Sequence, residues 1–534
     1  MKKLFALLLV AVLSVSIVAC DNNEQSNSKV GAIDIVIYAG GSSEFSWPKG
    51  TKEDEVINYI EDKYYNDTGV RLNFKTNTEL GKTMKENIIT DVTEGKVDIV
   101  ISHNGGGVGV DDWSMENGLF YDLDDYINEY LSDYVDDGYF KWSDGDTTLD
   151  GLKRMTTSNG EIIGIPSVIN PYKFGILVRK DWMNAAGYTD DASDTTKTYV
   201  GDFETFTEMA LKIKTQQNLG YAITGAIFDV EKAGLLGACG VNAGYYTNTV
   251  YSESSKVFVG PGYINPKYAE VLKIENDWST RGVLAADCDN ILITQGENNF
   301  IAGKSAIFVQ DPTVTHLIEI ARRAKAANPE AEFTILGALT KDKDSTEKGF
   351  MRNSAATFGA VIPKNSKHCK DIMKFLKWMY KSEDNYLLCR YGREGVDWIY
   401  DRDNNTYNYK SDSDYVNVPY SGILSLVENQ SIKNLSYGGY SADEKKWIEI
   451  SQRKENYVNN DTVDYFLYTQ NKELLTIKGN QAVYISQNAI RPIWFAKDGY
   501  SDVDSIFTVA RNNYVSNAEP YLTAMYNIYN NLRG

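Results

Sequence analysis

The sequence predicts an α/β protein built from more than one domain. Short apolar segments alternate with longer segments of helical periodicity, a pattern typical of βαβ units and a parallel sheet. At 534 residues the chain exceeds the length that one ordinary core supports. Its composition, with 43% hydrophobic and 24% charged residues, is that of a globular protein.

The alternation of strands and helices is clearest in residues 32–102. Apolar residues recur at helical spacing between two apolar runs, and Gly69 ends the helical stretch. In parallel sheets ligands bind just beyond the carboxyl ends of the strands, so the loops after the first and third strands are the expected ligand region. The predicted order is strand 32–41, helix 51–68, strand 70–74, helix 80–95 and strand 97–102.

Residues 159–188 break this pattern. Two short apolar segments, 162–165 and 174–178, are separated by "PSVINPY", which has a proline at each end. The second segment runs directly into "RKDWMNAAG", which predicts a helix ended by Gly187. A strand is thus stopped and restarted in the middle of the chain.

The strand and helix alternation returns in residues 298–311 and 355–384. The region after Asp401 is rich in tyrosine and asparagine, and we interpret it as helices covering one domain. Residues 401–412 alternate oxygen-bearing side chains but lack the glycine and the final glutamate of a calcium loop. A solvated hairpin turn is the favoured interpretation there, and a calcium site is the alternative.

The N-terminus has the features of an exported, lipid-anchored protein. Lys2 and Lys3 precede an apolar run that ends at Val18, which predicts a signal peptide over residues 1–19. Ala19 before Cys20 resembles the lipobox of bacterial lipoproteins, in which the cysteine thiol is acylated. Residues 20–30 would then be the lipidated cysteine and a flexible tether. The alternative is an ordinary signal peptide. No later segment of the sequence has the length and hydrophobicity of a membrane span.

Several classes of chemistry are disfavoured. A net charge of −19 argues against a nucleic-acid partner, because phosphate binding needs concentrated lysine and arginine. The 3 histidines are few for catalysis or metal binding, and neither H-E-x-x-H nor G-x-S-x-G is present. "AGKS" at 302–305 lacks the first glycine of a phosphate loop. We therefore expect no cofactor, no metal and no enzymatic activity.

Four cysteines remain after Cys20, and none of them lies in a CxxC or a zinc-type cluster. The sequence does not choose among their possible pairings. We favour buried, unpaired thiols over disulfides for Cys239, Cys288, Cys369 and Cys389.

The order of short motifs resembles the extracellular solute-binding proteins of carbohydrate-uptake ABC transporters, in particular their large lipoprotein members. "GKVDIVIS" is similar to the family's "gDiv" strand, "NGLFYDLDDYI" to its "Glf.dL" segment and "NGEIIGIP" to its "dGk.YgiP". "LVRKDWMNAAG", "GDFETFTEMALKIK", "NNFIAGKSAIFVQ" and "YGREGVDW" follow in the family's order. Ile163 replaces an aromatic residue of the family pattern, and "FVQDPT" lacks a tryptophan that some sugar binders carry.

The resemblance implies a two-lobed fold of the periplasmic-binding-protein type, with hinge crossings and a ligand cleft between the lobes. Lobe 1 would contain residues 32–167 and 311–357, and lobe 2 residues 170–309 and 359–534. Crossings are expected near 166–172, 310–312 and 358–362. On this interpretation "PSVINPY" is a hinge crossing.

A sugar needs flat apolar surface for its C–H faces and convergent polar groups for its hydroxyls. Candidate contacts lie in the loops after the first and third strands, in the first two expected crossings and at the end of "GREGVDW". We therefore name as ligand-binding candidates Glu44, Trp47, His103, Asn104, Trp113, Asn170, Tyr172, Gln310, Asp311 and Trp398.

The resemblance implies a receptor outside the cytoplasmic membrane that captures an oligosaccharide by lobe closure and delivers it to an ABC permease. Its expected partners are the carbohydrate, the permease subunits and, through Cys20, the membrane. The alternatives are a surface glycoside hydrolase acting on glycans and a lipoprotein adhesin. Paired carboxylates for a hydrolase are available among 73 acidic residues, but no pair stands out in the sequence.

Overall fold

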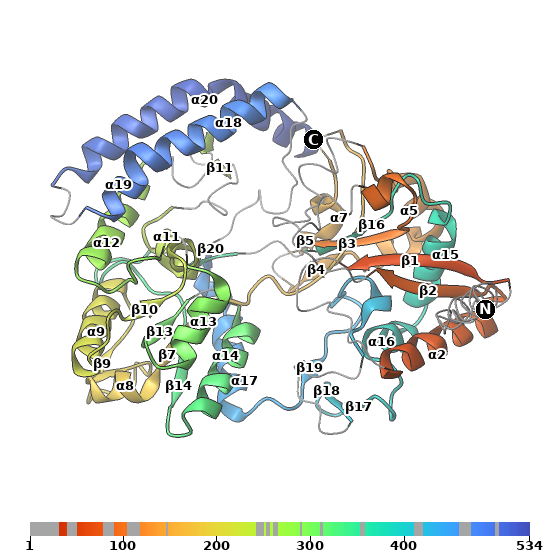
Figure 1. Cartoon of the computed structure of the whole chain (residues 1–534), viewed down its shortest axis with the longest axis horizontal. Helices are drawn as coiled ribbons and strands as arrows, with labels where there is room; N and C mark the ends of the chain where they lie inside the picture. Colours follow the sequence, from red (N-terminus) through yellow and green to blue (C-terminus); the bar gives the residue numbers. More distant parts are fainter. Residues whose placement is uncertain are drawn as a thin grey trace, which may run out of the picture.

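The computed structural model contains two mixed sheets, each surrounded by helices (Figure 1). It describes residues 31–39, 51–77, 90–103, 118–145, 148–157, 159–241, 250–252, 257–259, 265–288, 291–309, 313–352, 358–410, 420–458, 471–496 and 501–533.

The first sheet has the strand order β2-β1-β3-β16-β6. Strand β1 pairs in parallel with β2 and β3, as the βα alternation predicts. Strand β16 is antiparallel to both of its neighbours, β3 and β6. The bounds are β1 Ile33–Ala39, β2 Leu72–Asn77, β3 Ile99–His103, β6 Ile165–Pro166 and β16 Phe358–Val361.

Alternate residues of these strands point to opposite faces of the sheet, and both faces are covered. Ile35 and Ile37 contribute to the larger core, beneath helices α2, α15 and α16, whereas Tyr38 packs on the other face. We call this body lobe 1 (right in Figure 1). Its other helices and strands are α2 Thr51–Thr68, α5 Asp124–Tyr130, α6 Ser132–Asp136, β4 Lys141–Ser143, β5 Thr148–Asp150, α7 Gly151–Arg154, α15 Cys369–Tyr380, α16 Glu383–Tyr391, β17 Trp398–Asp401, β18 Thr406–Tyr409 and β19 Ser436–Tyr437.

The second sheet has the order β10-β13-β7-β14 and forms lobe 2 (left in Figure 1). Strand β7 is antiparallel to both β13 and β14 and is fully buried, so it is the centre of this lobe. Its elements include β7 Ile176–Arg179, α8 Lys180–Ala185, β8 Tyr188–Thr189, β9 Thr198–Tyr199, α9 Phe203–Gln216, β10 Ile223–Thr224, α10 Ile227–Val230, α11 Leu236–Ala238, α12 Tyr268–Thr280, α13 Ile293–Ile301, β13 Ile307–Phe308, α14 Val314–Ala327, β14 Phe333–Leu336, α17 Ala442–Ser451, α18 Lys472–Ile485, α19 Arg491–Trp494 and α20 Val503–Arg533.

The sheet pairing corrects the predicted lobe boundaries. Residues 311–357 were assigned to lobe 1, but β14 pairs with β7 in the second sheet. Residues from 359 on were assigned to lobe 2, but β16 lies inside the first sheet and α15 and α16 pack on it. The reason is that β16, "FGAV", is apolar on both faces and fills the position between β3 and β6.

Of the three predicted crossings, the first is the one that joins a strand of one sheet to a strand of the other. Residues 167–175 join β6 of the first sheet to β7 of the second, as predicted for "PSVINPY". Residues 310–312 lie outside the described residues, and the strands before and after them, β13 and β14, both pair with β7 of lobe 2. Residues 358–362 overlap strand β16. The chain instead crosses between β14 and β16, and again at 438–441 between β19 and α17.

The first crossing runs from β6 to β7, and the second runs from β14 to β16. In each sheet the two strands that these crossings join are neighbours. On the side of lobe 1, Gly359 of β16 pairs with Pro166 of β6. On the side of lobe 2, Leu336 of β14 pairs with Ile176 of β7. The strand pairing therefore holds the ends of the first crossing next to the ends of the second crossing, residues 337–357, in both lobes.

The region after Asp401 is shared by both lobes, which corrects its interpretation as helices of one domain. Strands β17 and β18 form the predicted hairpin, whose turn is closed by Asp401 accepting from the backbone and side-chain nitrogens of Asn404. Residues 420–435 join the core of lobe 1. Helices α18, α19 and α20 lie on lobe 2, where α18 and α20 pack side by side (Figure 1).

The four cysteines of the described residues are buried and outside disulfides, as predicted. Burial raises the pKa of the thiols of Cys239 and Cys369 to about 12, so both stay protonated. Among the described residues, no helix is both long and apolar enough to span a membrane.

The core of lobe 2 contains a pair of buried carboxyl groups. Glu231 and Glu275 are 1% and 0% exposed, and Glu231 is among the groups that shift the pKa of Glu275. The Tyr268 hydroxyl donates to Glu231, and the Trp494 indole donates to Glu275 at 2.6 Å. Burial, followed by the nearby charge of Glu231, raises the pKa of Glu275 well above its ordinary value. Glu275 therefore holds a proton and links α12 to α19.

This pair predicts a loss of stability as the pH rises. Because the pKa of Glu275 is higher in the folded than in the unfolded chain, stability falls as pH rises from about 4.5 towards the folded pKa. The variant Glu275→Gln mimics the protonated acid and should flatten this decline. Thermal unfolding followed from about pH 5 to about pH 9 measures it. The matched control is Glu270→Gln, an exposed glutamate on the same helix. Parallel pH profiles for Glu275→Gln and the unmodified chain would contradict a protonated Glu275.

Candidate functional site

The carboxyl ends of β1 and β3 lie next to each other at one edge of the first sheet. Ala39, the last residue of β1, is paired with Ile101, two residues before the end of β3 at His103. His103 is in turn paired with Phe358 of β16, so it lies where the second crossing enters lobe 1. The strands that precede the two loops predicted to bind ligand therefore end at the same edge of the sheet.

Most of the predicted contacts belong to those loops or to the residues after β13. Glu44, Trp47, Asn104, Trp113, Gln310 and Asp311 lie outside the described residues. Gln310 and Asp311 follow the carboxyl end of β13, which is parallel to β10. In the order of the chain they therefore follow a strand, as the loops after β1 and β3 do. Cys20 also lies outside the described residues.

Asn170 and Tyr172 lie in the first crossing, as predicted, but their described contacts are within the protein. The side-chain oxygen of Asn170 accepts from the backbone N–H of Tyr172 at 2.9 Å, which closes a turn. The backbone N–H of Asn170 donates to the Gln430 side chain at 2.8 Å. Tyr172 is 3% exposed and packs between other aromatic rings. These contacts hold the crossing in place and leave little of Tyr172 for a ligand.

Trp398 lies in lobe 1 and is 1% exposed. Its indole N–H donates to the carbonyl of Gly392 at 3.0 Å, and its ring stacks with Tyr400. The described surroundings of Trp398 are therefore those of a core residue, and no face of the ring is available to a sugar.

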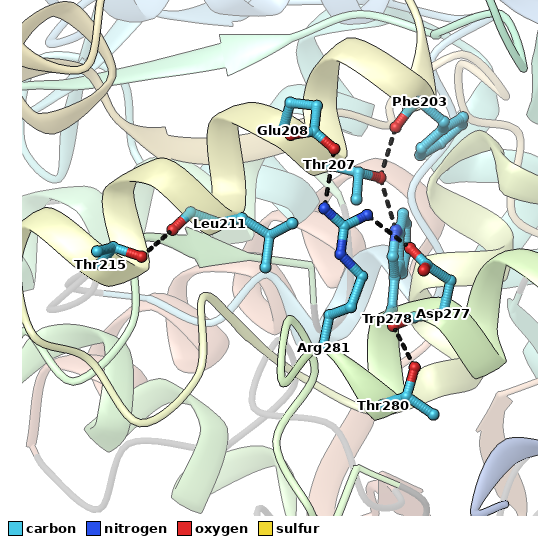
Figure 2. A network of polar contacts seen from close by, with 9 residues as sticks. All are labelled: Phe203, Thr207, Glu208, Leu211, Thr215, Asp277, Trp278, Thr280 and Arg281. Atoms are coloured by element: carbon cyan, nitrogen blue, oxygen red, sulfur yellow. Dashed lines mark hydrogen bonds and ion pairs between the residues drawn. The ribbon is translucent and has the colours of Figure 1, made fainter. Parts of the chain in front are cut away.

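A pocket of about 390 Å³ lies elsewhere, between α9 and α12 of lobe 2. Figure 1 shows these helices on the side of lobe 2 that faces away from lobe 1. At its floor the Trp278 indole donates to the Thr207 hydroxyl at 2.7 Å, and that hydroxyl donates to the carbonyl of Phe203 at 2.6 Å (Figure 2). The sequence did not predict this pocket, because most of its lining residues belong to two segments with the periodicity of ordinary amphipathic helices.

The charged side chains around this pocket neutralise one another. Arg281 bridges Glu208 at 2.9 Å and Asp277 at 3.1 Å, which ties α9 to α12 (Figure 2). Lys273 pairs with Glu270 and with Asp504 of α20. This arrangement joins three helices of lobe 2, and its cations are already paired, so we assign it a structural role.

The buried carboxyl pair, Glu231 and Glu275, is not arranged for glycoside hydrolysis. Catalytic carboxylates flank a sugar and must be accessible to it, whereas these two are almost completely buried in the core of lobe 2. Among the described residues no group of three or more histidine, cysteine, aspartate or glutamate side chains is placed to hold a metal ion.

Comparisons of structure agree with the two-lobed architecture. An extracellular solute-binding protein from Bifidobacterium longum subsp. infantis matches with a TM-score of 0.65 and 13% identity, covering 95% of this chain and 99% of that one. The N-glycan transport solute-binding protein NgtS of Streptococcus pneumoniae matches at 0.64 and 15%, covering 93% and 98%. The alginate-binding protein AlgQ2 matches at 0.63 and 12%, also covering 93% and 98%. At these identities the matches show the fold, which confirms the predicted periplasmic-binding-protein type.

The sequence comparison identifies the family. A search among curated proteins finds no match. The family model described as "Bacterial extracellular solute-binding protein", however, matches residues 48–386, which include the second sheet, every strand of the first sheet except β1, and the first two crossings. This match confirms the family that the ordered motifs resemble, and the chain belongs to the bacterial extracellular solute-binding proteins.

Proposed function

We propose that this protein is a lipid-anchored receptor outside the cytoplasmic membrane that captures an oligosaccharide and delivers it to an ABC permease. The observation that carries the proposal is the match of nearly the whole two-lobed chain to solute-binding proteins named for N-glycan transport and alginate binding. The lipobox at Cys20 supports the anchor.

The ligand would bind where strands end at the junction of the two lobes. The loops after β1 and β3 carry Glu44, Trp47, Asn104 and Trp113, and the residues after β13 carry Gln310 and Asp311. These side chains combine aromatic faces with hydrogen-bonding groups, which is the chemistry that sugar binding requires. His103, at the end of β3, completes the proposed surface.

Binding would be the whole of the mechanism, without covalent chemistry. A ligand held by both lobes stabilises the closed arrangement over the open one by its differential affinity for the two. The closed form would then dock on the permease. The described carboxyl pair is buried, so it does not support the hydrolase alternative.

The ligand class is tested by thermal unfolding in the presence of mono- and oligosaccharides. Because a ligand that binds only the folded chain raises its unfolding temperature, we expect a shift with at least one oligosaccharide and no shift with its monosaccharides. Chromatography of the incubated sugar should show no cleavage. A shift with peptides only, or cleavage of the sugar, would contradict the proposal.

The proposed contacts are tested with the oligosaccharide found in that screen. Trp47→Ala and Asn104→Ala each remove one contact of the proposed surface and should weaken binding by about tenfold or more in calorimetry. Tyr199→Ala removes a side chain that is 48% exposed on lobe 2 and should leave the affinity unchanged. Equal affinities for all three variants would place the ligand elsewhere.

The anchor is tested by cell fractionation. Cys20→Ala removes the thiol that would be acylated, and stable attachment requires the acyl chains. The variant should therefore appear in the soluble extracellular or periplasmic fraction. Asn22→Ala, in the tether, should stay with the membrane. Retention of Cys20→Ala in the membrane fraction would indicate another means of attachment.

A further inference from the structure

The junction of the two lobes has a small aromatic core of its own, which we call the hinge cluster: Trp142, Tyr172, Phe174, Phe350 and Tyr457. Its members come from different passages of the chain. Trp142 lies in β4 of lobe 1, Tyr172 and Phe174 in the first crossing, and Phe350 in the second. Tyr457 begins β20, Tyr457–Val458, which pairs with β15, Phe350–Met351, of the second crossing.

Ring contacts run through this cluster from one lobe to the other. The rings of Trp142 and Tyr172 are 5.3 Å apart at an interplanar angle of 81°. Tyr172 is 4.9 Å from Tyr457, and Tyr457 is 5.5 Å from Phe350. Edge-to-face pairs at these separations are attractive and depend on orientation. A change in the angle between the lobes would disturb them.

The Tyr457 hydroxyl fixes the first crossing to lobe 2. It accepts from the backbone N–H of Phe174 at 2.7 Å and donates to the carbonyl of Ser451 at 2.6 Å. Ser451 is the last residue of α17. Burial raises the pKa of Tyr457, so the phenol stays protonated and keeps both hydrogen bonds. On the other side, Val168 is hydrogen-bonded to Glu428 and Gln430 of lobe 1.

An ion pair joins the lobes beside this cluster. Asp144 follows β4 in lobe 1, and Lys454 lies in the short helix η5, Lys454–Asn456, directly before Tyr457. Their side chains are 2.9 Å apart and are 15% and 39% exposed, respectively. We call this contact the interlobe ion pair. Because its partners belong to different lobes, its length depends on how the lobes are oriented.

We propose that the hinge cluster and the interlobe ion pair form a latch that favours the lobe arrangement of this structure and thereby sets the affinity for ligand. The proposal rests on the proposed receptor function, because it assigns a means of control to the same binding site. A latch that favours one arrangement changes the fraction of molecules competent to bind, and the apparent affinity follows that fraction. Asp144, Lys454 and Tyr457 act as positioning residues and touch no ligand.

The first test measures the lobe arrangement without ligand, in the full chain carrying Cys20→Ala. Spin labels at Tyr59→Cys in α2 and Tyr199→Cys in lobe 2 replace side chains that are 49% and 48% exposed. Asp144→Asn and Lys454→Met should each broaden or shift the distance between the labels. The charge swap Asp144→Lys with Lys454→Asp should restore it. Arg281→Met removes a cation that is 40% exposed, close to the 39% of Lys454, from an ion pair within lobe 2, and should leave the label distance unchanged.

The second test measures affinity for the oligosaccharide from the thermal screen. Because the interlobe ion pair is partly exposed, Asp144→Asn and Lys454→Met should each change the affinity by about two- to fivefold, both in the same direction. The charge swap should reverse this change. Tyr457→Phe keeps the ring but removes two hydrogen bonds, so it should move the label distance in the same direction as Asp144→Asn.

Unchanged label distances in Asp144→Asn and Lys454→Met would overturn the latch, as would a charge swap that fails to restore them. Changed distances with unchanged affinity would also overturn it, because the latch would then not control binding. If no carbohydrate binds, the proposed function fails, whereas the ligand-free distances still decide whether the latch exists.

Discussion

The pairing of β16 with β3 and β6 is the constraint on which the two-lobed structure depends. The first sheet is completed by residues 358–361, which follow the entire second sheet in the chain. Lobe 1 therefore acquires its full sheet only after the chain has passed through lobe 2 and returned. Since Gly359 pairs with Pro166 and Leu336 with Ile176, the outgoing and returning crossings are aligned at both ends. The hinge cluster is a direct consequence, because this alignment brings side chains of both crossings together.

The local part of the fold could be predicted from the sequence. Apolar runs and helical spacing are local signals, and they predicted β1, α2, β2 and β3 and their parallel pairing. The stop at Pro166 predicted the first crossing, and the structure confirms it. The lobe boundaries beyond 310 were wrong, because an apolar strand such as "FGAV" does not specify its partner, and the choice between two sheets is decided by long-range packing.

The sequence predicts the candidate site at the ends of strands, and most of its candidate side chains lie outside the described residues. Tyr172 and Trp398 have aromatic rings that suit a sugar, but both are used in packing. The same holds for much of the tyrosine content, since Tyr38, Tyr64, Tyr380 and Tyr386 are almost fully buried. Glu231 and Glu275 were missed for the opposite reason. Isolated glutamates indicate a solvated surface, and only the packing of α12 against α19 places this pair inside lobe 2.

The hinge cluster also limits what a ligand must do. Moving a two-state equilibrium from about 1:99 to about 99:1 requires a differential affinity of about 5.5 kcal/mol. An aromatic pair contributes about 0.5 to 1.5 kcal/mol beyond its burial, and a partly exposed ion pair at most about 1 kcal/mol. The latch is therefore strong enough to bias the lobe arrangement but too weak to oppose a ligand that is held from both lobes. The proposed receptor would need such a balance, because it would have to bind its ligand tightly and then release it. Changes at the hinge would alter this balance without altering the side chains proposed to contact the ligand.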